Sequence, residues 1–263
     1  MDKLPSASAG DALRFAFGTL TVLPARLTRW DRAAARGGML AAPLVGVVIG
    51  LAAATCGGLL VALGAGPLLA AVGAVAVPAV LTRGLHLDGL ADTADGLGSG
   101  KEADDALRVM KQSDIGPFGV VVLVFVLLAQ TASVAACYGH GWLYGGAAAL
   151  IAAVSARVAL LAACRRGIPA ARPGGLGAAV AGAVPPSLAL TATVLCTPLA
   201  AAAGLGFGGL TWLRCGAAAL AAVGTGEALL RRCVHRFGGV TGDVFGAITE
   251  SATTAALLTV ALR

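Results

Sequence analysis

Hydrophobic residues occur in long runs along most of the chain, separated by short polar segments. A helix needs about 20 apolar residues to cross the hydrocarbon core of a bilayer. Seven runs come close to this length: 39–63, 67–82, 118–137, 146–163, 184–204, 211–230 and 246–262. The last run is the least apolar, because it contains Glu250 and several Thr or Ser residues. The pattern predicts an all-α, polytopic membrane bundle of six to seven transmembrane helices, forming a single integral membrane domain over residues 1–263.

The N-terminal part does not follow this pattern. Residues 1–9 are polar, and we expect them to be disordered. Residues 11–30 mix apolar side chains with polar ones and with Pro24, which predicts an interfacial or re-entrant segment rather than a span. In the first span, Gly46 and Gly50 form a GxxxG pair, which permits close helix packing but is a weak signal in a chain with 38 glycines.

Composition and charge agree with a membrane protein. Hydrophobic residues make up 58% of the chain and charged residues only 12%, whereas soluble domains carry about 25% charged residues. The net charge of +6 is dispersed over short loops, which argues against a nucleic-acid partner. The six cysteines show no CxxC spacing and are predicted to be small buried hydrophobes.

The loops alternate in charge. Those at 26–38, 83–117, 164–183 and 231–245 carry several Arg or Lys, whereas 64–66, 138–145 and 205–210 carry none. Short basic loops stay in the cytoplasm. The alternation therefore places all four basic loops at the cytoplasmic face of the cell membrane.

The loop at 83–117 holds the most informative polar pattern. Asp88, Asp92 and Asp95 are spaced i, i+4 and i+7, so on a helix they occupy a stripe about 60° wide. Carboxylates this close repel each other unless a cation lies among them, and hard oxygen ligands suit Mg²⁺, Mn²⁺ or Ca²⁺. The alternative is a solvated helix face at the membrane border. We predict a metal site, because the surrounding sequence is so poor in charge.

Ionisable residues within the predicted spans are also candidates for a site. Arg157, Glu227 and Glu250 fall in the cytoplasmic halves of their helices. Burial of a charge in lipid is costly, so such residues often mark functional sites. For Arg157 and Glu227, snorkelling to the interface is an equal alternative.

Several motifs resemble the cobalamin synthase family, whose activity is that of adenosylcobinamide-GDP ribazoletransferase. They are HLDGLADTADGLG (86–98), VMKQSDIGPFG (109–119) and GGVTGDVFGA (238–247), and the likeness extends to 15–26 and 42–46. The resemblance implies transfer of a phosphoryl-linked group: adenosylcobinamide-GDP reacts with α-ribazole or its 5′-phosphate, and GMP leaves. It also implies Mg²⁺ as cofactor and a late step of cobalamin biosynthesis in the bacterial cell membrane.

Specific residues receive roles from this resemblance. Asp88, Asp92 and Asp95 are expected to bind the metal and to act in catalysis. His86 is expected to be a general base or a phosphate hydrogen-bond donor, with a structural interfacial role as the alternative. Asp243 would complete the metal site or hold the nucleotide, or else belong to a turn and helix cap. The remaining candidates for substrate binding are Arg83, Arg108, Lys111, Arg157, Arg165, Arg172 and Thr241.

Two other classes remain as alternatives. An ion-coupled transporter also uses carboxylates in membrane helices. A different membrane transferase, of the CDP-alcohol phosphotransferase type, also uses an Asp-rich helix, but its DGxxARxxxxxxxxG pattern is absent here. The expected partners are the two substrates and the lipid bilayer; self-association or association with other cobamide-assembly enzymes is left open.

Overall fold

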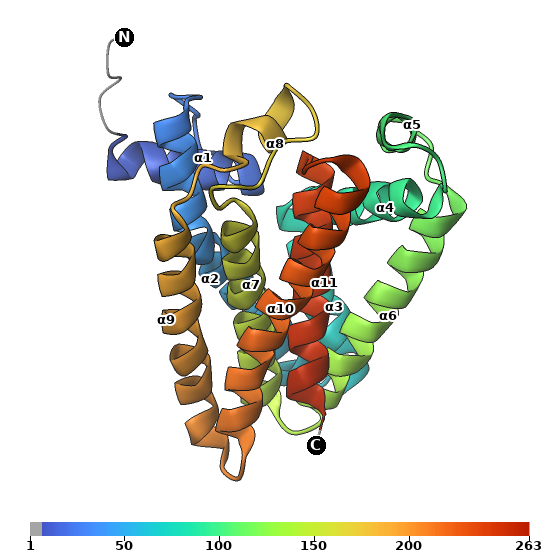
Figure 1. The fold of residues 1–263 in the computed structure, drawn as a ribbon. Coiled ribbons are helices and arrows are strands. Elements are labelled where there is room, and N and C mark those ends of the chain that lie inside the picture. Colours follow the sequence, from blue (N-terminus) through green and yellow to red (C-terminus); the bar gives the residue numbers. More distant parts are fainter. Residues whose placement is uncertain (1–6, 263) are drawn as a thin grey trace.

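The structure, a computed structural model, describes residues 7–262, which fold as a helical bundle (Figure 1). Part of the segment expected to be disordered, residues 1–6, lies outside this range, whereas Ser8 caps the first helix. The helices are α1 (Ala9–Leu20), α2 (Arg32–Ala62), α3 (Pro67–Leu81), α4 (Leu85–Gly98), α5 (Ala103–Val109), α6 (Pro117–Tyr138), α7 (Trp142–Ala163), α8 (Gly175–Val180), α9 (Pro186–Gly204) with the 3₁₀ turn η1 (Leu205–Phe207), α10 (Thr211–Phe237) and α11 (Gly242–Ala261).

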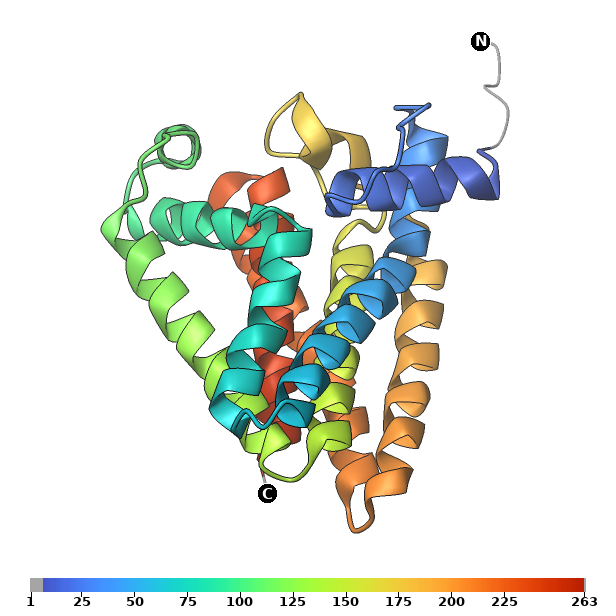
Figure 2. The ribbon, with the colours of Figure 1, turned by 180° about the vertical axis from the view of Figure 1, so that it is seen from behind.

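Six of the seven predicted spans are confirmed, and the one at 67–82 is too short to cross a membrane by itself. Within residues 7–262, six helices are long and apolar enough to cross a membrane: α2, α6, α7, α9 with η1, α10 and α11. The pair α3 and α4 would make a seventh span, but the two helices meet at an angle of 86°. As a result α3 runs with the bundle, whereas α4 lies across its end (Figures 1 and 2).

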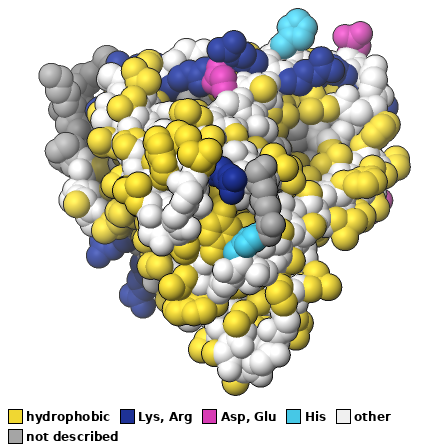
Figure 3. Space-filling model, turned by 90° about the horizontal axis from the view of Figure 1, so that it is seen from below, with side chains coloured by type: hydrophobic (Ala, Val, Ile, Leu, Met, Phe, Trp, Pro, Cys, Tyr) yellow, Lys and Arg dark blue, Asp and Glu magenta, His cyan; other side chains and the backbone are white. Residues whose placement is uncertain are grey.

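The polar connections gather at one end of the bundle. In Figure 1, α1, α4, α5, α8 and the α10–α11 turn lie at the top, and the short turns α2–α3, α6–α7 and α9–α10 lie at the bottom. Seen from below, hydrophobic side chains cover much more of the lower end than charged ones, and the white areas are backbone or other side chains (Figure 3). The alternation of basic and neutral loops along the chain thus corresponds to two distinct ends of the molecule.

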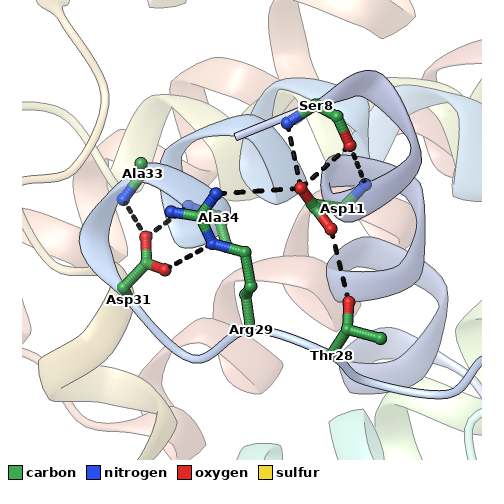
Figure 4. Close-up of polar contacts among 7 residues, drawn as sticks. All are labelled: Ser8, Asp11, Thr28, Arg29, Asp31, Ala33 and Ala34. Carbon is green, nitrogen blue, oxygen red and sulfur yellow. Dashed lines mark hydrogen bonds and ion pairs between the residues drawn. The ribbon is translucent and has the colours of Figure 1, made fainter. Parts of the chain in front are cut away.

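A network of polar contacts attaches α1 across the start of α2 (Figure 4). The Asp11 carboxylate accepts hydrogen bonds from Ser8 and from the Thr28 hydroxyl, and it lies 3.8 Å from the Arg29 guanidinium. Arg29 also donates to Asp31 at 2.7 Å, and Asp31 in turn accepts from two backbone amides in the first turn of α2. The expectation that residues 11–30 are interfacial or re-entrant stays a prediction. Leu13 and Trp30 remain 40% and 56% exposed, available to the lipid surface.

Helix α7 forms the centre of the bundle, and α2 packs closely against it. A Cβ on Gly46 would lie 2.7 Å from the Ala153 carbonyl oxygen, and one on Gly50 would lie 2.8 Å from the Leu150 Cα. The GxxxG pair therefore provides the close contact between α2 and α7, as small residues do in membrane bundles.

Candidate active site

The position of α4 follows from a turn of two residues after α3. Arg83 and Gly84 both adopt left-handed backbone conformations, with φ of 53° and 71°. A residue with a side chain pays about 1–2 kcal/mol for this conformation. The turn directs α4 across the polar end of the bundle, outside the six spanning helices (Figure 1).

A close helix crossing brings α4 to the start of α11. A Cβ on Gly89 would lie 2.6 Å from the Asp243 carbonyl oxygen, and one on Gly246 would lie 3.1 Å from the His86 Cα. The absent side chain of Gly89 thus admits the backbone of α11. This contact joins the acidic helix and the GGVTGD segment, although about 150 residues separate them.

The three Asp residues of the stripe have different environments. Asp88 is exposed, Asp92 is half-buried and Asp95 is buried. The Asp95 carboxylate accepts hydrogen bonds from the backbone amides of Gly116 and Gly119, at 2.8 and 3.0 Å. These amides belong to the N-terminus of α6, where a negative charge is favourable. Asp95 therefore caps α6 from a neighbouring helix.

Asp88, Asp92 and Asp243 form what we call the acidic cluster. Burial, together with the negative charges of Asp88, Asp243 and Asp95, raises the pKa of the Asp92 carboxyl to about 7, against a lowering by Arg172. These charges interact because α4 and α11 meet at Gly89. The cluster thus concentrates negative charge that a cation would stabilise.

Arg172 and Thr241 orient Asp243. The Thr241 hydroxyl accepts from the amide of Val244, so Thr241 is the N-cap of α11, and it donates to Asp243 Oδ2 at 3.1 Å. Arg172 Nη1 lies 3.6 Å from the same oxygen, and its other nitrogen donates to the carbonyl of Leu107. Arg172 therefore links the 164–183 loop, α5 and α11 around one carboxylate.

His86 lies on the face of α4 that points toward α7. The Arg157 Nη2 atom is 3.3 Å from His86 Nδ1. A guanidinium can only donate, so Nδ1 accepts and the ring proton resides on Nε2. Burial, together with the charge of Arg157, lowers the pKa of His86 well below its usual range. A neutral ring with an N–H at Nε2 favours the donor role over the base role, and Nε2 has no partner among the described residues.

Arg157 belongs to a polar network inside the bundle rather than to a cavity surface at the polar end. It is 2% exposed, and the negative charge of Glu250 acts on it. Gln130 donates to Glu250 at 2.9 Å and to Thr254 at 3.1 Å. Arg157 thus reaches the site through His86 and is placed to orient that ring.

Two adjoining cavities open on either side of α4. The α11-side cavity has a volume of about 770 Å³ and is bordered by His86, Arg172 and Asp243. The α6-side cavity has a volume of about 1030 Å³ and is bordered by Asp88 and Asp92. The side chains of Leu85 and Lys111 border both cavities.

The predicted basic residues divide among these surfaces. Arg83 borders the α6-side cavity, and Arg108 and Arg172 border the α11-side cavity. Arg165 lies outside both cavities and forms an ion pair with Glu227 at 2.9 Å.

Sequence reasoning did not identify Gly246 as part of the crossing of α4 and α11, or Gln130 as the partner of Glu250. The position of Gly246 in the GGVTGDVFGA motif could have indicated the helix crossing. The position of Gln130, a polar residue deep in an apolar span, could have indicated a buried polar partner.

Comparisons with known proteins agree over nearly the whole chain. The family model described as cobalamin-5-phosphate synthase matches residues 12–261. The chain is 42% identical over 262 residues to an adenosylcobinamide-GDP ribazoletransferase of Frankia casuarinae, covering 95% of this chain and 94% of that protein. It is 41% identical over 256 residues to the enzyme of the same name from a Nocardioides species, covering 96% and 99%. A third, from Bradyrhizobium diazoefficiens, is 36% identical over 254 residues, covering 95% and 92%. No solved structure matches the chain.

Proposed function

The chain belongs to the cobalamin-5-phosphate synthase family, and we propose that it joins adenosylcobinamide-GDP to α-ribazole or α-ribazole 5′-phosphate, with release of GMP. The observation that carries the proposal is the acidic cluster of Asp88, Asp92 and Asp243 beside Arg172 at the polar end of the bundle. Carboxylates and a guanidinium converging from separate segments are the groups that a phosphoryl transfer requires.

The reaction exchanges one phosphoester bond for another. A ribose hydroxyl of α-ribazole or of its 5′-phosphate attacks the phosphorus attached to cobinamide, the bond from that phosphorus to GMP breaks, and its electron pair leaves with GMP. The proton of this hydroxyl passes to a carboxylate, for which Asp243 is positioned beside Arg172. Arg83, Lys111 and Arg172 border the cavities and hold phosphate oxygens by charge-assisted hydrogen bonds.

We assign Mg²⁺ to the acidic cluster. Among residues 7–262, no three His, Cys, Asp or Glu side chains already stand together as a metal site. Mg²⁺ is usually held by one or two carboxylates together with substrate phosphates and waters, so two carboxylates would be enough for it. Asp88 and Asp92 would hold the ion, and Asp243 would lie beside it. The ion would neutralise charge on the diphosphate and on the departing GMP.

Asp95 and His86 take supporting roles in this proposal. The Asp95 oxygens are engaged by the α6 amides, so Asp95 holds α4 and α6 in register rather than binding the metal. His86, oriented by Arg157, supplies an N–H in the wall of the α11-side cavity. Both residues keep the acidic cluster rigid, which transition-state stabilisation by fixed charges requires.

The position of the cluster favours an enzyme over a carrier. Secondary transporters place their substrate and coupling-ion sites near the middle of the bilayer, at broken helices. Here α4 lies across one end of the bundle, with Asp88 exposed (Figure 2). We assign this end to the cytoplasm of the cell membrane, because the basic loops gather there.

One assay tests the proposed function directly. The purified protein in lipid nanodiscs is mixed with adenosylcobinamide-GDP and α-ribazole, with Mg²⁺ or with excess EDTA. We expect stoichiometric formation of GMP and adenosylcobalamin with Mg²⁺ and a loss of orders of magnitude with EDTA. Absence of GMP release under all conditions contradicts the proposal. Equal rates with Mg²⁺ and with EDTA would contradict the proposed role of Mg²⁺ but not the proposed transfer reaction.

A further inference from the structure

We infer that α4 divides the site by substrate: the α11-side cavity takes the nucleoside acceptor, and the α6-side cavity takes the diphosphate of the donor. This inference rests on the proposed function and assigns each substrate its own binding surface. The surface that selects the base of the nucleoside acceptor would then be formed by α8, α11 and the 164–183 loop.

The geometry of α4 creates the division. Asp88 and Asp92 are four residues apart and share one face, whereas His86 lies about 200° around the helix from Asp88. Asp88 and Asp92 accordingly border the α6-side cavity, and His86 borders the other. The two cavities meet where Leu85 and Lys111 border both. At this junction the nucleophile could approach a phosphorus atom from one cavity while the leaving group departs toward the other, as in-line transfer requires.

The charge of the α6-side cavity suits a diphosphate. Its border carries Arg83 and Lys111 together with the carboxylates of Asp88, Asp92 and Asp114. Arg83 and Lys111 would contact phosphate oxygens directly, and the carboxylates of Asp88 and Asp92 would do so through a cation. The volume of about 1030 Å³ also makes it the larger of the two spaces, and the donor is the larger substrate.

The α11-side cavity combines an apolar floor with a polar rim. Met39, Val240 and Phe245 are 1%, 0% and 4% exposed and form part of its lining. Arg172 and Asp243 stand at its border. Binding sites for small molecules have this construction, with apolar walls for the ligand body and a few polar groups for orientation. A nucleoside fits it, with the aromatic base on the apolar floor and the ribose hydroxyls at the rim.

One wall of this cavity, formed by Val240 and α8, is fixed by backbone hydrogen bonds and close packing. Val240 donates to the carbonyl of Pro169 at 2.9 Å and accepts from the amide of Ala171 at 2.9 Å. A Cβ on Gly177 would lie 2.8 Å from the Gly242 nitrogen, so α8 packs directly on the start of α11. A wall fixed in this way can discriminate between bases by shape.

A matched pair of variants tests the division. Leu176 borders only the α11-side cavity and Leu123 only the α6-side cavity, and both side chains are half-buried. Leu176→Trp fills the first space and Leu123→Trp the second. We expect Leu176→Trp to raise the KM for α-ribazole about tenfold or more while leaving the KM for adenosylcobinamide-GDP within about twofold. We expect Leu123→Trp to do the reverse.

The outcomes separate the inference from the function. Reversed effects, or equal effects of both variants on both substrates, overturn the inference while GMP release by the parent protein upholds the transferase. A parent protein that releases no GMP overturns the function itself and the inference with it. If either Trp variant fails to fold, Leu176→Ala and Leu123→Ala replace the pair, with calorimetric binding of α-ribazole as the readout. A weakening confined to Leu176→Ala supports the inference, and any other pattern contradicts it.

Discussion

The backbone of Gly89 on α4 lies directly against the backbone of Asp243 at the start of α11. A Cβ at Gly89 would come within 2.6 Å of the Asp243 carbonyl oxygen and 2.9 Å of its Cα. Both atoms are backbone and cannot rotate away, so any side chain at position 89 must push the two helices apart. The distance between the two parts of the acidic cluster therefore depends on this glycine.

Gly89→Ala is expected to lower turnover by about tenfold to a hundredfold, because a shift near 1 Å in a catalytic group can cost that much. GMP release by protein of verified membrane content measures the effect. Gly224→Ala is the matched control: a Cβ there meets no atom within 4 Å, and the change should leave turnover intact. Full activity of Gly89→Ala would show that the spacing of α4 and α11 is not critical.

Asp95→Ala should destabilise the protein without changing its metal requirement. Loss of a cap costs about 0.5–2 kcal/mol, which a lower unfolding temperature in detergent would report. Asp88→Ala, at an exposed position, should leave that temperature nearly unchanged and raise the Mg²⁺ concentration needed for half-maximal activity. A comparable rise for Asp95→Ala would instead make Asp95 a metal ligand.

Asp92 and Asp243 should act as one unit in catalysis. We expect Asp92→Asn alone to reduce turnover by orders of magnitude, because it removes a carboxylate from the metal and from the developing charge. The losses of turnover caused by Asp92→Asn and Asp243→Ala should be strongly non-additive in the double variant. The reason is that the first change already disables the unit in which both residues act. Single-turnover rates at saturating Mg²⁺ provide the comparison, and simple multiplication of the two losses would assign the residues independent roles.

Arg83→Gly should separate stability from activity. Glycine adopts the left-handed conformation at this position, where φ is 53°, without the steric cost that arginine pays. The unfolding temperature is therefore expected to stay constant or rise, while the KM for adenosylcobinamide-GDP increases because a phosphate contact is lost. Arg83→Lys should restore part of the affinity through its charge. An unchanged KM in Arg83→Gly would remove Arg83 from the substrate site.

The orientation in the membrane can be tested with an impermeant thiol reagent in intact cells. Ser113→Cys lies in the exposed α5–α6 segment, and Gly206→Cys lies in the turn at the opposite end. We expect Gly206→Cys to label in intact cells and Ser113→Cys only after the membrane is opened. The parent chain serves as the blank, because its cysteines are buried or half-buried. The opposite labelling pattern would invert the proposed topology.

The sequence by itself determined the class of fold, the spans and the helix that carries the Asp stripe. Lipid requires every spanning segment to satisfy its backbone internally, so local composition is enough to predict helices. The i, i+4, i+7 spacing likewise predicted the shared face of α4, and Asp88 and Asp92 do border one cavity.

Only the tertiary structure decided what each polar group contacts. Asp95 looked equivalent to Asp92 along the sequence, but the arrival of α6 over the end of α4 turned it into a cap. His86 was recognisable as a candidate, but its tautomer depends on Arg157, 71 residues away. Such contacts depend on how helices rotate and cross, which is set by close packing among residues distant in sequence. No local pattern encodes that arrangement, because it emerges only when the whole bundle has assembled.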